Sequence, residues 1–170
     1  IIELSKMFQA TSDVILSEDL KDIPRPPVKN GRPEQINIQR SANITKFMGY
    51  LADLYAWFEN LPSGDKKDYT HIPLLIYGLS RKATIDLRLI DSNAQDDATS
   101  KVNICVMKTV QKYKEYDSVN GAQVIFCDLY QNSNGKRVFF NVYEELKRKL
   151  VANGIPVSEI AVINDYSTDK

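Results

Sequence analysis

Residues 123–164 contain the pattern that most constrains how this chain can fold. An apolar run, QVIFCDL, is followed by a polar loop, an amphipathic stripe and a second apolar run, SEIAVIND. Short apolar runs between polar segments are typical of strands that are buried on both faces of a parallel sheet. Two parallel strands joined by a helix are expected to form a right-handed crossover. The pattern therefore predicts a strand–helix–strand unit.

Apolar residues spaced three and four apart predict three amphipathic helices in the chain. Ser41 can cap the first helix, which is expected to end near Asn60, and Ser100 can cap the second. The third helix lies between the two predicted strands. It is expected to end at Asn153–Gly154, because glycine suits the left-handed turn past a helix end.

Two further segments are expected to be ordered. HIPLLIYGLSRKATIDLRLI is interrupted by Pro73 and Gly78, so only SRKATIDLRLI is predicted to form a short helix. Ile36 and Ile38 alternate with polar residues, which predicts a short, half-buried strand. The expected fold class is therefore α/β, with a small and mostly parallel sheet flanked by helices.

The composition indicates one soluble domain and excludes several classes of site. The chain has 170 residues, and Lys plus Arg equals Asp plus Glu at 22 each, so the whole-chain charge argues neither for nor against a polyanion partner. One histidine and two cysteines without CxxC spacing argue against a zinc site, and no metal ligand is predicted. No apolar run is long enough to span a membrane. We expect an extended, proline-rich connector over residues 1–33 and one domain over residues 34–170.

Motifs for nucleotide and hydrolytic chemistry are absent from the sequence. It has no GxxxxGK[ST], no GxGxxG, no GxSxG and no HExxH, so no catalytic residue and no cofactor is predicted. The lone His71 is expected to be structural or exposed. Cys127 has no second histidine to serve as its base, so a buried and inert thiol is expected.

Asp128 and Asp165 follow the two predicted strands, at the edge where open α/β sheets bind ligands. Acidic residues at strand ends also cap the following turns, which is the commoner role. The basic run Lys147–Lys149 suits the dipole at the C-terminal end of a helix. Neither feature is specific for a function by itself.

The order of segments from Asp22 to Lys170 resembles one family. DIPRPPVKNGRP, SRKATIDLRLID, QVIFCDL, VYEELKRKLVANGIP and IAVINDYSTDK occur in the order found in the second RecA-like lobe of superfamily-two helicases. The branch that it resembles is the chromatin-remodeller-like helicases of bacterial plasmids, phages and conjugative elements. The QVIFCDL stretch corresponds to helicase motif IV, which comprises Gln123, Val124, Ile125, Phe126, Cys127 and Asp128.

This resemblance implies a partial RecA-like lobe, with a strand–helix–strand unit at residues 123–164, from a bacterial and cytoplasmic DNA helicase or translocase. The parent enzyme would use ATP and Mg²⁺, which this segment would not bind by itself. The preceding ATP-binding lobe and DNA would be its partners, and the segment could also self-associate through an uncovered sheet edge. The DNA backbone would be contacted from the loops after the strands, by Gln131, Asn132, Lys136, Arg137, Ser167 and Thr168.

Two other classes of function are open. A non-catalytic α/β interaction module would bind a protein through the helix of residues 41–60, which is rich in aromatic residues. A small-molecule enzyme would use Asp128 and Asp165, although no phosphate loop and no nucleophile–base pair accompanies them. A Walker motif upstream or an arginine motif downstream in the reading frame would favour the helicase.

Overall fold

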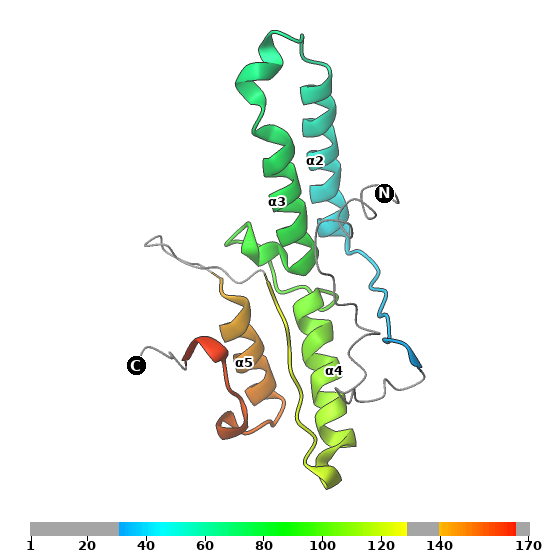
Figure 1. Cartoon of the computed structure of the whole chain (residues 1–170), viewed down its shortest axis with the longest axis vertical. Coiled ribbons are helices and arrows are strands. Elements are labelled where there is room, and N and C mark those ends of the chain that lie inside the picture. Colours follow the sequence, from blue (N-terminus) through cyan, green and yellow to red (C-terminus); the bar gives the residue numbers. More distant parts are fainter. Residues whose placement is uncertain (1–30, 129–139, 166–170) are drawn as a thin grey trace, which may run out of the picture. The chain divides into compact units, whose positions relative to one another are not determined.

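The structure is a computed structural model, which describes residues 31–128 and 140–165. The backbone divides into two units, Ile1–Asn37 and Ile38–Lys170, and the helices considered below all belong to the second unit (Figure 1). The connector expected over residues 1–33 lies almost entirely outside the described residues.

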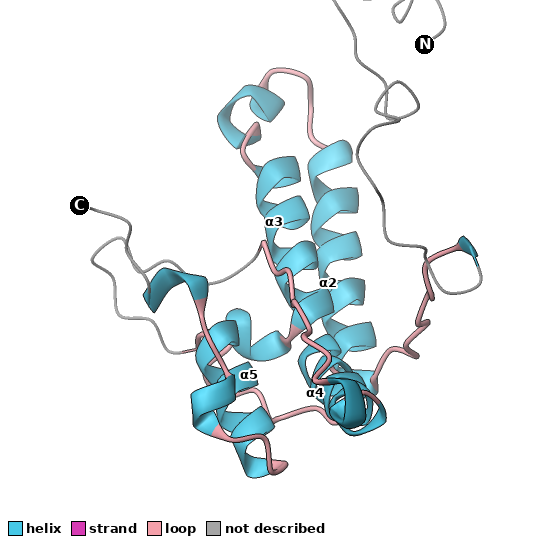
Figure 2. Ribbon diagram, turned by 60° about the horizontal axis from the view of Figure 1, so that its bottom comes forward, coloured by secondary structure: helices cyan, strands magenta, loops and turns pink. Residues whose placement is uncertain are grey.

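Helices account for all the regular structure in the described ranges (Figure 2). The α-helices are α2 (Ala42–Glu59), α3 (Ile72–Ile85), α4 (Lys101–Glu115) and α5 (Val142–Ala152). Short 3₁₀ helices are η2 (Asp65–Tyr69), η3 (Leu87–Leu89), η4 (Asp117–Val119), η5 (Val157–Glu159) and η6 (Ile163–Asp165). α2 packs against α3, and α4 packs against α5.

The prediction of a three-layer α/β fold with a parallel sheet is wrong, because the described residues form no strand. Of the two predicted core strands, QVIFCDL and SEIAVIND, residues 123–127 and 160–162 are extended but form no ladder, and Ile36 and Ile38 are not in a strand either. Paired strands must lie about 4.8 Å apart. Here a groove separates the two extended segments, so their backbones cannot pair with each other.

The three predicted amphipathic helices are confirmed, and local capping chemistry explains where they begin and end. The Ser41 hydroxyl accepts a hydrogen bond from the backbone N–H of Ile44, and Ser100 accepts one from Asn103. α5 ends at Asn153, and Gly154 follows with φ +91°, which favours glycine over any other residue.

α3 begins earlier than the sequence predicts. The helix starts at Ile72 and runs through Gly78, so Pro73 lies in its first turn. Proline is tolerated there because the first backbone N–H groups of a helix have no partner within the helix. The expectation that Pro73 and Gly78 interrupt this segment was therefore wrong.

A single apolar core joins α4, α5 and the turn before α4. Its buried members are Leu89, Val102, Val106, Val142, Leu146, Leu150 and Ile155. Cys127 and Ile160, one from each extended segment, pack against this core from its edge. The core thus holds each extended segment through a side chain on one face, without a sheet.

Candidate functional site: a groove between two extended segments

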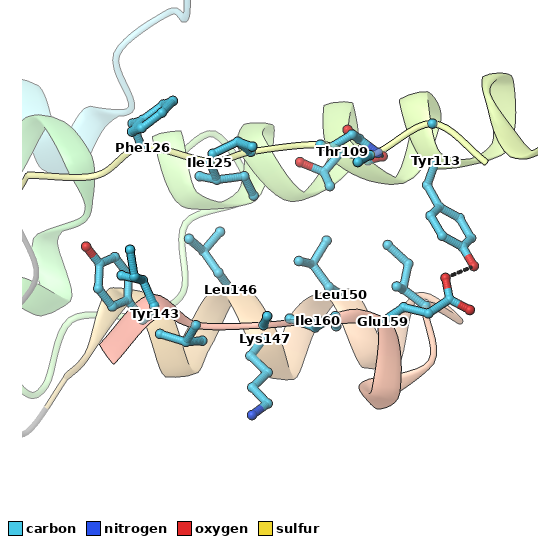
Figure 3. A pocket seen from close by; sticks show the side chains of 18 of the residues that line it. Thr109, Tyr113, Ile125, Phe126, Tyr143, Leu146, Lys147, Leu150, Glu159 and Ile160 are labelled. Atoms are coloured by element: carbon cyan, nitrogen blue, oxygen red, sulfur yellow. Dashed lines mark hydrogen bonds between the residues drawn. The ribbon is translucent and has the colours of Figure 1, made fainter. Parts of the chain in front are cut away.

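A groove of about 900 Å³ lies between residues 122–127 and residues 160–162 (Figure 3). Helices α4 and α5 form its floor, and Leu146 and Leu150 of α5 point into it. Both extended segments run in the same direction along its two sides (Figures 1 and 3). This volume is within the range of about 300–1,000 Å³ that is typical of ligand sites.

Two tyrosines tie the extended segments to the helices across the groove. The hydroxyl of Tyr113 on α4 donates a hydrogen bond to the carboxylate of Glu159, 2.8 Å away, just before the second segment (Figure 3). The hydroxyl of Tyr143 on α5 donates one to the carbonyl oxygen of Cys127, also at 2.8 Å. α4 therefore holds the segment that follows α5, and α5 holds the segment that follows α4. These two hydrogen bonds fix the two sides of the groove.

The outer face of the first segment is apolar and exposed to solvent. Val124 is 75% and Phe126 91% exposed, whereas the alternate residue Cys127 packs against the core. This alternation is the period of two that extended backbone imposes. Ile160 of the second segment also packs against the core, and Ile163, in η6 just after that segment, is 82% exposed. A row of large apolar side chains in water is typical of a surface that a partner covers.

An ion-pair cluster lies at the other side of the α5 helix and holds it to the α3–α4 connection. Arg88 donates hydrogen bonds to both carboxylate oxygens of Asp86, at 2.9 and 2.8 Å, and to Glu145 at 2.9 Å. Its guanidinium carbon lies 4.4 Å from the ring centroid of Phe140. Lys149 binds Asp96 from the last turns of α5. This Arg88 cluster is a structural clamp, because its charges bind one another.

The basic run of α5 is paired in the same way. Lys147 lies 3.9 Å from Asp165, Arg148 donates to Glu145 at 2.8 Å, and Lys149 contacts Asp96. The helix-dipole explanation for this run is thus incomplete, since carboxylates neutralise its charges. A phosphate at these residues would have to compete with the acidic partners already in place.

Two carboxylates of the cluster have lowered pKa values. The hydrogen bond from Arg148 lowers the pKa of Glu145, against the opposing effect of burial, and Arg88 lowers it further. Burial alone would raise the pKa of Asp96, but hydrogen bonds from Lys149 and Asn103 and the charge of Arg88 hold it below its ordinary value.

These shifts predict acid destabilisation. A carboxylate with a lower pKa in the folded state stabilises the fold above its unfolded pKa, and this stability is lost as the pH falls through the folded value. We therefore expect the urea midpoint of unfolding to fall as the pH is lowered from about 5 to about 3. Circular dichroism at each pH measures it. The double variant Asp96→Asn/Glu145→Gln should show a shallower dependence, and an unchanged slope would contradict this assignment.

The six residues predicted to contact DNA lie outside the described residues, so their role stays a prediction. They are Gln131, Asn132, Lys136, Arg137, Ser167 and Thr168. Asp128 is exposed at a bend, and Asp165 pairs with Lys147. The motif IV residues Gln123–Asp128 line the groove in place of forming a core strand.

The aromatic residues of α2 divide between core and surface. Phe58 is buried and Phe47 is half-buried, whereas Tyr50, Tyr55 and Trp57 are exposed. Trp57 packs edge-on against Tyr69, with the ring centroids 5.1 Å apart. The expectation that α2 carries more aromatic residues than its buried stripe needs agrees with these exposures.

The lone histidine and the two thiols have no catalytic arrangement around them in the described part. His71 is exposed just before α3, and both cysteines are free and half-buried. Burial raises the pKa of Cys105, which lowers the fraction of reactive thiolate. The described residues contain no group of three or more potential metal ligands.

Sequence reasoning missed the groove, because its walls come from segments that were assigned to adjacent strands. The four consecutive apolar residues Val124–Cys127 give no indication that one face of this segment is exposed. None of the helices in the described ranges is both long enough and apolar enough to cross a bilayer. Comparison with known proteins finds no matching family model, no matching curated protein and no matching solved structure.

Proposed function

We propose that this chain is a non-catalytic protein-interaction module, which binds an apolar stretch of a partner polypeptide in the groove. The observation that carries this proposal is the combination of an apolar floor with exposed apolar side chains along the groove. Leu146 and Leu150 form the floor, Val124 and Phe126 are on one side, and Ile163 of η6 lies just beyond the end of the other side. Burying such side chains stabilises a complex by about 25 cal/mol for each Å² of apolar surface.

The charges around the groove favour an apolar partner over a polyanion. Lys147, which lines the groove, is paired with Asp165, and Glu159 and Asp117 add negative charge to the lining. A nucleic acid would need unpaired cations along its path. The DNA translocase suggested by the family resemblance stays a prediction, and no feature of this groove supports it.

Peptide selection tests the proposed function. A random peptide library displayed on phage is selected against the purified chain and against the variant Ile125→Glu, which places a carboxylate at the groove. We expect apolar peptides to be enriched on the wild-type chain and to bind Ile125→Glu at least about tenfold more weakly, because the carboxylate would have to be desolvated.

Val151→Glu is the matched control. Val151 is an exposed apolar residue of α5 that does not line the groove, so the same substitution should leave peptide binding unchanged. Enrichment of no peptide family, or equal binding to the wild-type chain and Ile125→Glu, would contradict the proposed function.

A further inference from the structure

We infer that the occupant of the groove is an extended strand, which inserts between residues 122–127 and residues 160–162 and pairs with both of them. This inference rests on the proposed function, because it concerns the same groove, and it adds the conformation and chemistry of the partner. The bound form would contain three adjacent strands, two from this chain and a central one from the partner.

The backbone of the two segments supplies the first argument. Among the described residues, no backbone–backbone hydrogen bond reaches Val124, Ile125, Phe126 or Ala161. The first side therefore offers the N–H and C=O groups of three successive residues to a partner. On the second side the N–H of Ile160 and the C=O of Val162 are already bonded within the chain, which leaves the C=O of Ile160, both groups of Ala161 and the N–H of Val162. A helical occupant could not use them, because its own backbone groups are bonded within the helix. An extended strand presents donors and acceptors on both of its edges.

The direction of the two segments supplies the second argument. Both run the same way along the groove (Figures 1 and 3). A strand between them is therefore parallel to both or antiparallel to both, so one repeating backbone pattern serves both edges. In the complex the two segments would be separated by two strand spacings, about 9.6 Å.

The side chains supply the third argument and define the sequence of the partner. Alternate residues of an inserted strand would face Leu146 and Leu150 on the floor, and the others would lie level with Val124 and Phe126. Both surfaces are apolar. β-Branched residues stabilise a strand when their side chains lie beside apolar side chains of the adjacent strands. The expected partner is therefore a short segment rich in valine, isoleucine or threonine, without proline.

N-methylated peptides test this inference. The probe is a synthetic, end-capped nonapeptide of sequence KTVTVTVTK, whose valine N–H groups all lie on one edge of the strand and whose threonine N–H groups lie on the other. One analogue is N-methylated at the valines and a second at the threonines. Binding is measured by titration calorimetry with the whole chain. Backbone amide signals of residues 122–127 and 160–162 are followed by NMR.

We expect the unmodified peptide to bind and to shift the amide signals of both segments. Each analogue should bind on the order of tenfold more weakly or worse, because methylation removes the peptide's hydrogen-bond donors along one edge. Ile125→Glu should lose binding of the unmodified peptide, whereas Val151→Glu should keep it.

Every other outcome overturns the inference in a recognisable way. Weakening by only one analogue would mean that the peptide pairs with one segment alone. Equal binding of all three peptides would mean that the occupant is not a paired strand. Failure of the unmodified peptide to bind would also refute the inference. The proposed function fails separately, if the phage selection yields no groove-dependent peptide.

Discussion

Replacing Arg88 by alanine is expected to lower the free energy of unfolding by about 3–5 kcal/mol, because it leaves buried carboxylates without their partner. Asp86 is only 1% exposed, and Arg88 satisfies both of its carboxylate oxygens. The same guanidinium binds Glu145 of α5 and stacks on Phe140, so the substitution also detaches α5 from the α3–α4 connection. Urea unfolding followed by circular dichroism measures the change.

Two further variants separate this clamp from a general effect of removing a cation. Arg88→Lys keeps the charge but loses the planar fork that binds Asp86 and Glu145 together, so an intermediate loss is expected. Arg81→Ala removes an exposed arginine of α3 and should change stability by no more than about 0.5 kcal/mol. A loss for Arg88→Ala no larger than that for Arg81→Ala would show that the cluster does not stabilise the fold.

Replacing Leu51 by alanine is expected to destabilise the α2–α3 pair by about 2–5 kcal/mol, since the substitution leaves a cavity between packed helices. Leu51 is 2% exposed and lies in the middle of the buried stripe of α2, between Ile44 and Phe58. α2 packs on α3 in the described structure, so faster amide hydrogen exchange is expected in both helices. Mass spectrometry of deuterated fragments measures this exchange.

Leu74→Ala is the matched control for the α2–α3 pair. Leu74 is 74% exposed on α3, so the same substitution removes little buried surface and should change stability by no more than about 0.5 kcal/mol. Equal effects of Leu51→Ala and Leu74→Ala would mean that the buried stripe of α2 does not hold the pair together.

The helices could be predicted because their signals are local. Ser41 and Ser100 satisfy backbone N–H groups three residues ahead, and Gly154 takes the left-handed conformation after α5. α3 shows the limit of this reasoning. Pro73 was expected to interrupt a helix, but the helix starts at Ile72, so Pro73 lies in its first turn. A proline has opposite effects in the first turn and in the interior of a helix.

The strands could not be predicted because a strand requires a partner. QVIFCDL has the composition of a buried strand, but no backbone group of the described residues is hydrogen-bonded to the backbone of Val124, Ile125 or Phe126. Apolar composition alone does not state whether the neighbour is a strand of the same chain, a helix or another polypeptide. The family resemblance carried the same assumption, and the sheet that it implied is absent from the described structure.

The groove also depends on contacts between residues that are distant in the sequence. Tyr113 and Glu159 are 46 residues apart, and Arg88 and Glu145 are 57 residues apart. No local pattern indicates that these side chains meet. The predicted DNA-contacting residues were chosen from their order along the chain and lie outside the described residues, so their placement stays a prediction.

By itself, the sequence determined the amphipathic helices, their caps and the extended character of the first apolar run, because these depend on residues within a few positions of one another. Only the tertiary structure decided that the two apolar runs stay apart, with a groove between them and apolar side chains facing solvent. The physical reason is that extended backbone is completed by hydrogen bonds to a neighbour, and the identity of that neighbour is a property of the whole fold.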